Sequence, residues 1–309
     1  MGRYLVTGIA GFIGAAVATR LLREGHEVLG VDNLRTGFLD NVPAGAECIE
    51  ADCQDPALYS SRLPKKKFDA ILHIAGQSSG EISFDDPAYD LRTNAESTLH
   101  LLKFALACGC TRFIYASTMS VYGVQPDAPV TEEAPTVPHS FYGVGKLASE
   151  HYLRLYEQYG IRSTSLRLFN VYGPGQNMEN MRQGMVSIFM SMMLKEGHIV
   201  VKGSPNRYRD FVYIDDVVQA FMLCLQEPLS CGKVLNVASG MKTSVGSLVE
   251  SLKALSPTPV TIEYSGCTAG DVHGIYADVS MAAKCLGYES AVSLPEGLAA
   301  MYEWAKAKN

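Results

Sequence analysis

The chain has 309 residues, of which 47% are hydrophobic, and carries a formal net charge of −6 at pH 7. This length and composition allow one large core with a smaller companion domain. The basic residues are scattered, which argues against a nucleic-acid surface. Apolar runs are too short to span a bilayer, and the first residues already read as a strand, so we expect a cytoplasmic protein without membrane attachment. The eight cysteines fall mostly in apolar patterns, and no metal site is predicted.

The first fourteen residues predict a strand, a glycine turn and a helix. The apolar run at 4–6 leads into Gly8-x-x-Gly11-x-x-Gly14, after which a helical pattern begins. Glycines permit a tight turn and close backbone approach, while a helix N-terminus offers free N–H groups to a phosphate. The alternative is a plain turn. We expect a dinucleotide cofactor here, with contacts from Gly8, Gly11, Phe12, Ile13 and Gly14.

The next strands predict the rest of the cofactor site. The strand at 27–31 ends at Asp32, which would bind the adenosine ribose hydroxyls and favour NAD over NADP, although Arg35 nearby softens this preference. Short apolar runs at 47–49 and 68–74 alternate with helical segments, which is typical of a parallel sheet with its ligand crevice beyond the strand ends. Asp52 there could hold the adenine amino group or be a simple loop carboxylate. The further expected cofactor contacts are Asn33, Asp52, Cys53 and Ala75.

A long amphipathic helix is predicted from Asp86 to Cys108, because apolar positions recur there at helical spacing. Asn94 lies among them. A buried asparagine needs partners, so it either reaches a catalytic or cofactor group or is a satisfied core amide.

Hydroxyl groups mark the next strand end. The strand at 112–116 runs into Ser117-Thr118, and Tyr142 and Lys146 then share one face of a helix predicted from 141 to about 159. A tyrosine is a poor base near neutral pH until positive charge stabilises its phenolate, and Lys146 could supply that charge. Tyr-x-x-x-Lys also occurs by chance in ordinary helices.

Taken together, the glycine turn, Asp32, Asn94, the Ser117-Thr118 strand end and Tyr142-x-x-x-Lys146 resemble the extended short-chain dehydrogenase/reductase family. The segments 167–174 and 209–216 look like its sugar-nucleotide branch. The resemblance implies an α/β fold, a Rossmann-type doubly wound parallel sheet with a smaller C-terminal substrate lobe. It implies NAD-binding residues 1–173, with some later segments returning to that domain, and a substrate lobe mainly at 174–309.

The resemblance also implies residue roles. Thr118 would hydrogen-bond the reacting hydroxyl, Tyr142 would take its proton, and Lys146 would bind the nicotinamide ribose; Asn94 would contact the cofactor. Asn170 and Arg209 match positions that hold the substrate diphosphate, a task that suits a guanidinium.

The residues after Thr118 indicate the reaction. Dehydratases of this branch place an Asp-Glu pair there, whereas this chain has Met119 and Ser120, which cannot act as a carboxyl acid or base. Hydride removal and return remain, a pattern most similar to that of the UDP-glucose 4-epimerases. The expected substrate is therefore UDP-glucose or UDP-galactose, with N-acetylated sugars, uronates and other nucleotide sugars left open. NAD, regenerated in each turnover, should copurify.

Three positions depart from the family pattern. Thr268 stands where an arginine usually grips the diphosphate, and Arg182, Arg207 or His273 could replace it. Lys202 stands where an aromatic residue often stacks on the base. Ile275 replaces a tyrosine that narrows the sugar pocket in some epimerases, so the pocket could admit an N-acetyl group.

The resemblance further implies a homodimer that pairs the helices predicted at 86–108 and 141–159 in a four-helix bundle. Other activities remain open, namely epimerisation at another carbon and NAD(P)-dependent reduction of a sugar nucleotide. A non-catalytic NAD-binding sensor is a more remote alternative. Because Tyr142 and Lys146 are both present, we favour the enzyme.

Overall fold

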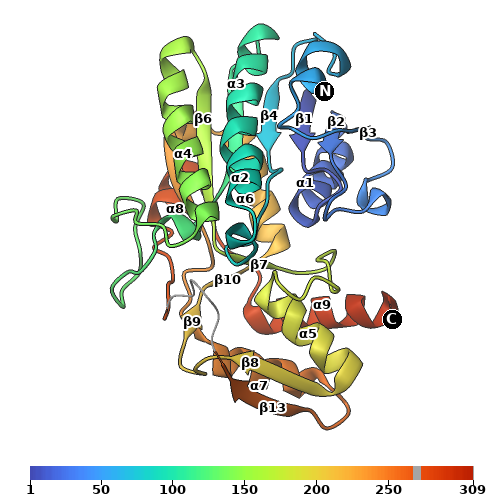
Figure 1. The fold of residues 1–309 in the computed structure, drawn as a ribbon, viewed down its shortest axis with the longest axis vertical. Coiled ribbons are helices and arrows are strands. Elements are labelled where there is room, and N and C mark those ends of the chain that lie inside the picture. The colour runs from blue at the N-terminus through green and yellow to red at the C-terminus, as the bar shows by residue number, and fades with distance from the viewer. Residues whose placement is uncertain (267–272, 309) are drawn as a thin grey trace.

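A seven-stranded parallel sheet forms the centre of the larger lobe (Figure 1). The computed structural model describes residues 1–266 and 273–308. Every strand of this sheet runs parallel to its neighbours. In spatial order the strands are β11 (Lys233–Val237), β6 (Arg162–Leu168), β5 (Arg112–Thr118), β4 (Ala70–His73), β1 (Arg3–Thr7), β2 (Glu27–Asp32) and β3 (Glu47–Glu50). The chain therefore reverses its winding direction at β1, and such a switch point opens a crevice at the strand ends.

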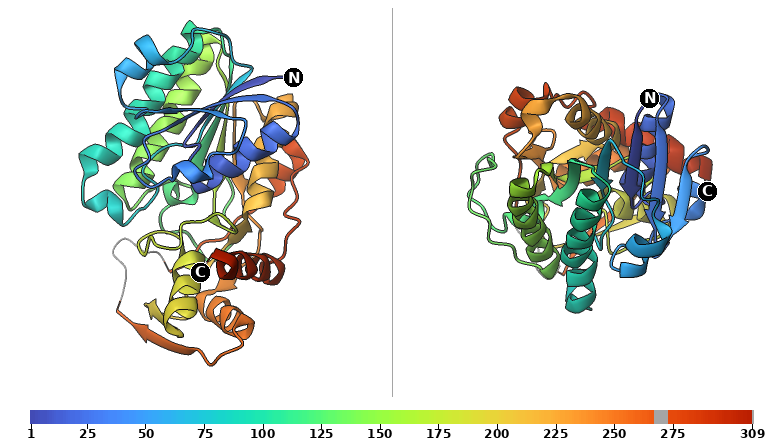
Figure 2. Two further views of the ribbon diagram at one scale, coloured as in Figure 1. Left: turned by 90° about the vertical axis from the view of Figure 1, so that its right-hand side faces the viewer. Right: turned by 90° about the horizontal axis from the view of Figure 1, so that it is seen from above.

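Helices cover both faces of this sheet, as Figure 2 shows. Alternate residues of a strand point to opposite faces, so Leu5 of β1 packs under one helical layer and Val6 under the other. One layer contains α3 (Ser97–Ala107) and α4 (Phe141–Tyr156), and the other contains α1 (Phe12–Arg23) and α6 (Ile214–Gln226). The predicted doubly wound α/β fold is confirmed.

The smaller lobe lies below the strand ends (Figure 1). It comprises α5 (Met185–Glu196), α7 (Val245–Leu255), α9 (Leu294–Lys308), and β8 (His198–Lys202) paired with β13 (Thr261–Ser265). Buried side chains of α5 and α7 belong to the same apolar cluster as those of α1 and α6. One core therefore runs from the sheet into the smaller lobe and holds the two lobes together.

Shorter elements connect the two lobes. Two-stranded pairs link β7 (Asn170–Tyr172) with β10 (Phe211–Tyr213) and β9 (Tyr208–Arg209) with β12 (Thr243–Ser244). Helix α8 (Ser280–Leu286) packs on β11 and so returns to the larger lobe.

The helix predicted at 86–108 is interrupted. It begins with α2 (Pro87–Leu91), passes through wider π-type turns at Arg92–Glu96, and continues as α3. Asn94 lies in these turns, where its carbonyl oxygen accepts hydrogen bonds from the hydroxyls of Thr98 and Ser149. The wider turn is closed by a hydrogen bond from the Ser97 N–H to the Arg92 carbonyl, and such π-bulges are frequent at functional sites.

Candidate functional site

The glycine turn lies at the end of β1 and packs closely against its surroundings. Gly8 has a φ of +75°, and a Cβ atom there would lie 2.9 Å from the Ala75 nitrogen. A Cβ atom at Gly14 would overlap the Gly8 carbonyl oxygen. Both positions therefore require glycine. Helix α1 begins directly after these residues, so the backbone N–H groups of its first turn are available to a phosphate.

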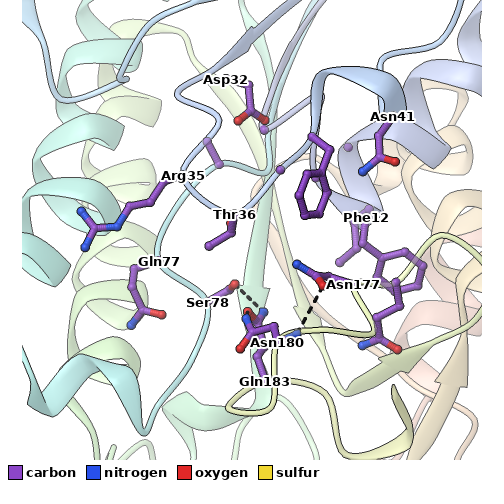
Figure 3. Close-up of a pocket in the computed structure, with 18 of the residues that line it drawn as sticks. Phe12, Asp32, Arg35, Thr36, Asn41, Gln77, Ser78, Asn177, Asn180 and Gln183 are labelled. Carbon is purple, nitrogen blue, oxygen red and sulfur yellow. Dashed lines mark hydrogen bonds between the residues drawn. The ribbon is translucent and has the colours of Figure 1, made fainter. Parts of the chain in front are cut away.

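A cavity of about 800 Å³ opens beside this turn (Figure 3). Among the residues that line it, ten carry sequence-predicted cofactor roles: Gly8, Gly11, Phe12, Ile13, Gly14, Asp32, Asn33, Asp52, Cys53 and Ala75. A cavity of this size and shape, with a glycine cradle at one end, fits a dinucleotide.

Asp32 is held in place by backbone groups on both sides. Its carboxylate oxygens accept hydrogen bonds from the N–H of Ala10 and the N–H of Leu34, each at 2.9 Å. Asn33 donates to Asp52 at 2.8 Å, which joins the ends of β2 and β3 at the cavity. These bonds fix the two carboxylates at the end of the cavity where the adenosine would lie.

Sequence reasoning assigned no cofactor contact to several residues of this cavity, although it named Arg35 as an influence on cofactor preference and Arg182 as a possible diphosphate anchor. Asn41 donates to the Ala10 carbonyl at 3.0 Å, and the Arg35 guanidinium lies 4.0 Å from the centre of the Tyr89 ring. Ser78, Arg182 and Gln183 line this cavity and also a second one. They lie in irregular segments, where no periodicity marks a residue as facing a ligand.

Ser78, Arg182 and Gln183, which line both cavities, are held by hydrogen bonds and ion pairs. Gln183 donates to Ser78 Oγ at 2.6 Å, as Figure 3 shows. The Arg182 guanidinium pairs with Asp85 at 2.6 Å and with Glu81 at 3.1 Å. These contacts join the loop before α5 to the segment after β4.

The catalytic candidates lie together at the inner end of the site. Thr118 is the last residue of β5, and its Oγ1 donates to Ser120 Oγ at 3.2 Å. Tyr142 and Lys146 are buried on the first two turns of α4, which begins where Ser140 Oγ accepts the N–H of Gly143. The Lys146 Nζ atom donates to the Ala116 carbonyl at 2.9 Å and lies 5.9 Å from the centre of the Tyr142 ring.

Burial dominates the electrostatics of this cluster. It raises the pKa of Tyr142 to about 12, an effect that a hydrogen bond with Thr118 opposes and that the charge of Asp90 increases. Burial lowers the pKa of Lys146 to about 8, opposed by the charges of Asp90 and Glu150. A group that is to act as a base here therefore depends on its charged neighbours.

Asn94 is fully buried beside this cluster. Its side-chain nitrogen donates to the Gln77 carbonyl at 3.0 Å. Its Oδ1 atom has no hydrogen-bond partner among residues 1–266 and 273–308. A buried amide oxygen left without a partner suits a ligand that donates to it.

The second cavity, of about 490 Å³, lies between the ends of the sheet and the smaller lobe. Asn170, Arg209 and Ile275 line it, together with Met119 and Ser120. Asn170 donates to the Asp210 carbonyl at 2.9 Å, and Arg209 Nη1 donates to the Tyr208 carbonyl at 2.7 Å. These bonds hold both side chains at the cavity wall.

Of the departures from the family pattern, Thr268 lies outside the described residues. Arg182, Lys202 and Arg207 line the second cavity, whereas His273 stacks edge-on against Tyr208. Within the described ranges, no group of three or more His, Cys, Asp or Glu side chains is placed to hold a metal ion, and no helix there could cross a bilayer.

This fold and site define a short-chain dehydrogenase/reductase of the extended class, with a dinucleotide cavity beside a Tyr-Lys pair. A family model for the NAD dependent epimerase/dehydratase family matches residues 4–238. The chain belongs to that family, and its cofactor is NAD.

Several proteins similar to this chain are UDP-glucose 4-epimerases. A UDP-glucose 4-epimerase of Mycolicibacterium smegmatis is 34% identical over 314 residues, covering 99% of each chain. The structure of UDP-glucose 4-epimerase from Thermotoga maritima with UDP-glucose has a TM-score of 0.93 and 34% identity, covering 99% of each chain. The Thermus thermophilus UDP-glucose 4-epimerase complex with NAD has a TM-score of 0.90 and 30% identity, covering 99% of this chain and all of the other.

Proposed function

We propose that the protein is an NAD-dependent 4-epimerase of a UDP-sugar, with UDP-glucose and UDP-galactose as its substrates. One observation carries this proposal. Lys146 Nζ would lie 3.5 Å from a Cβ atom at Gly76, which lines the NAD cavity. A Cβ atom at Gly143, the residue after Tyr142, would lie 2.6 Å from the backbone oxygen of Ser120, which lines the second cavity. Met119 and Ser120 follow Thr118 in the chain, where elimination of water would require a carboxyl group.

Residues 1–173, with later segments that return to the sheet, would hold NAD, and residues 174–309 would supply most of the substrate lobe. The glycine cradle would receive the pyrophosphate, and the Asp32 carboxylate would bind the adenosine ribose. Asn94 Oδ1 and Lys146 would meet the nicotinamide ribose. NAD, when bound, supplies the acceptor for the C4 hydride and returns that hydride to the sugar.

The reaction at C4 would use three side chains. Thr118 would hydrogen-bond the C4 hydroxyl and orient it toward the Tyr142 phenolate, which would accept its proton. The positive charge of Lys146 would stabilise that phenolate, as would the cationic nicotinamide of the oxidised cofactor. After the 4-keto sugar has rotated in the cavity and hydride has returned to its other face, Tyr142 would return the proton to the oxygen at C4, whose configuration is now inverted.

The second cavity would hold the diphosphate and the sugar of the substrate. Asn170 and Arg209 would bind the diphosphate, and Arg207 at the same wall would stand in for the arginine that Thr268 replaces. Ile275 is only 4% exposed and lines this cavity with an aliphatic side chain, so we propose that an N-acetylated sugar also fits.

The proposal includes a homodimer formed through the outer face of α3 and α4. Several apolar side chains on this side are exposed to solvent: Leu91 at 57%, Leu106 at 38%, Val144 at 53% and Leu155 at 60%. Light scattering should give twice the chain mass of 33.5 kDa, and the mass of one chain at micromolar concentration would rule the dimer out. The cytoplasmic location stays a prediction.

The experiment that tests the function is an NMR assay of purified protein without added cofactor. UDP-glucose, UDP-galactose, UDP-N-acetylglucosamine and UDP-glucuronate are each followed over time, beside a Tyr142→Phe control. Interconversion at C4 that the control lacks supports the proposal. No turnover of any of the four, with NAD still bound, would contradict it and point to another base or another carbon.

A further inference from the structure

A buried carboxyl group lies beside the catalytic pair and has no part in the reaction described above. Asp90 is the fourth residue of α2 and is 1% exposed. Its Oδ2 atom accepts a hydrogen bond from Gln77 Nε2 at 2.7 Å. Its Oδ1 atom is buried and has no hydrogen-bond partner in the part of the chain that the structure describes. Because burying a carboxylate is costly, burial raises the pKa of Asp90, an effect that the charge of Lys146 opposes.

Two close approaches place this carboxyl group in the same cluster as Lys146. Helices α2 and α4 pack together at Gly145, where a Cβ atom would lie 3.4 Å from Asp90 Oδ1 and 3.2 Å from Asn94 Cβ. A Cβ atom at Gly76 would overlap Asn94 Oδ1 and lie 3.5 Å from Lys146 Nζ. The two glycines thus let both backbones approach closely enough for Asp90, Asn94 and Lys146 to share one buried space.

The protonation state of Lys146 depends on the groups that surround it in this buried space. Its side chain is 3% exposed, and an ammonium group has three hydrogens, of which the Ala116 carbonyl accepts one. Burial lowers its pKa to about 8 even though nearby negative charge opposes the shift, so a loss of that negative charge would lower the pKa of Lys146 further.

Asp90 and Glu150 are the two carboxylates that raise the pKa of Lys146, Asp90 more than Glu150. Glu150 is itself paired with the Arg167 guanidinium at 2.7 Å, so its charge is largely compensated. The titratable groups that face Lys146 from the elements packed around it are Asp90 of α2, Tyr142 and Glu150 of α4, Tyr115 of β5 and His73 of β4. Burial keeps the pKa of His73 well below its usual range, so this histidine is neutral and adds no charge.

We propose that Asp90 is a positioning residue whose carboxylate keeps the Lys146 ammonium charged and so sets the pH range in which Tyr142 accepts the substrate proton. The proposal rests on the proposed function, because it assigns Tyr142 as the base. A neutral Lys146 could not stabilise the Tyr142 phenolate. Asp90 also opposes that phenolate directly, so its carboxylate raises the pH at which each of the two groups loses its proton.

The test compares the wild-type protein, loaded with NAD, with Asp90→Asn. The amide is isosteric and its oxygen can still accept from Gln77. Asp86→Asn is the matched control, because Asp86 lies four residues away as the exposed N-cap of α2, where asparagine caps equally well. The titration of Lys146 is followed by NMR of ¹³C-labelled lysine side chains, assigned with Lys146→Met, and the pH profile of kcat is measured in parallel.

We expect Lys146 to titrate about one pH unit lower in Asp90→Asn, the size of effect typical of one nearby carboxylate. Both limbs of the kcat profile should move to lower pH, and Asp86→Asn should match the wild-type protein in both measurements. An unchanged Lys146 titration in a folded Asp90→Asn variant would overturn the proposal. Because this titration needs no turnover, it separates failure of the proposal from failure of the proposed function.

A reciprocal measurement covers the case in which Asp90→Asn does not fold. In Lys146→Met, the positive charge that lowers the pKa of Asp90 is gone, so the ¹³C carboxyl signal of Asp90 should titrate at higher pH than in the wild-type protein. An unshifted Asp90 signal in this variant would show that the two groups are not coupled and would overturn the proposal.

Discussion

Glu150 and Arg167 form a buried ion pair, with 2.7 Å between Glu150 Oε2 and Arg167 Nη2, beside the end of β5. Both side chains are about 5% exposed. Ser117 Oγ donates to Glu150, and the Arg167 guanidinium lies 4.6 Å from the centre of the Tyr122 ring. The pair therefore connects α4 and β6 with the residue immediately before Thr118.

Arg167→Met should destabilise the protein strongly, because it leaves the Glu150 carboxylate buried without its partner. Removing one member of a buried pair typically lowers the free energy of unfolding by about 3–5 kcal/mol. Urea unfolding measures the change. The double variant Glu150→Leu with Arg167→Met removes both charges and should recover much of the loss; a single variant as stable as the wild-type protein would contradict this account.

Tyr142→Phe should lower kcat by roughly 10²–10⁴-fold, the usual contribution of a general acid–base group, while NAD stays bound. The phenylalanine retains the ring and its packing and loses only the hydroxyl. Tyr115→Phe is the matched control, since Tyr115 is equally buried and its ring centre lies 4.8 Å from Lys146 Nζ. The NMR assay measures both variants, and equal losses of kcat would show that Tyr142 has no special role.

Stability should fall as the pH drops below the ordinary histidine range. His73 is buried between the hydroxyls of Thr7 and Thr98, and burial, together with the charge of Lys146, holds its pKa well below 6.5. Below about pH 6.5 His73 therefore binds a proton in the unfolded chain but stays neutral in the folded protein. Above about pH 6.5 His73 does not change the free energy of unfolding. Below that pH its protonation in the unfolded chain lowers the free energy of unfolding by up to about 1.4 kcal/mol per pH unit.

Urea unfolding between pH 5 and 8 checks the pH dependence, with His73→Gln as the comparison. The variant should show a shallower loss of stability toward pH 5, whatever its absolute stability. Parallel curves for the two proteins would mean that His73 does not contribute.

Ile275→Tyr should narrow the second cavity where the sugar would bind. Ile275 lines that cavity with a smaller side chain than tyrosine, so the substitution fills space that an N-acetyl group would need. We expect kcat/KM for UDP-N-acetylglucosamine to fall at least about tenfold relative to that for UDP-glucose, in keeping with a steric clash of a few atoms. If the wild-type protein turns over UDP-glucose and not UDP-N-acetylglucosamine, the proposal that an N-acetylated sugar fits beside Ile275 is wrong.

Much of the sheet could be predicted from the sequence, because apolar strands of a buried parallel sheet leave a strong signal. The first βαβ unit was predicted from the apolar run at 4–6, the Gly8 turn and Asp32, and the structure places a cavity beside this turn. The break between α2 and α3 could not be predicted. No proline or glycine marks it in the sequence, and one of the hydroxyls bonded to the Asn94 carbonyl there belongs to Ser149, which lies on another helix.

The Tyr-x-x-x-Lys motif was visible in the sequence, whereas its electrostatic surroundings were not. Tyr142 and Lys146 share a helix face, which spacing alone indicates. Asp90 reads as one more polar residue of an amphipathic helix, and only packing at Gly145 shows it to be buried beside that pair. Arg182 likewise gains its partners Glu81 and Asp85 from a segment about a hundred residues away.

The most direct test of the central claim follows one hydrogen atom. UDP-glucose carrying deuterium at C4 is incubated with the purified protein in ordinary water, without added cofactor, and the product is analysed by NMR. Removal and return of hydride within one active site predicts UDP-galactose that retains deuterium at C4. Product with hydrogen at C4, or no product although NAD is bound, would contradict the account.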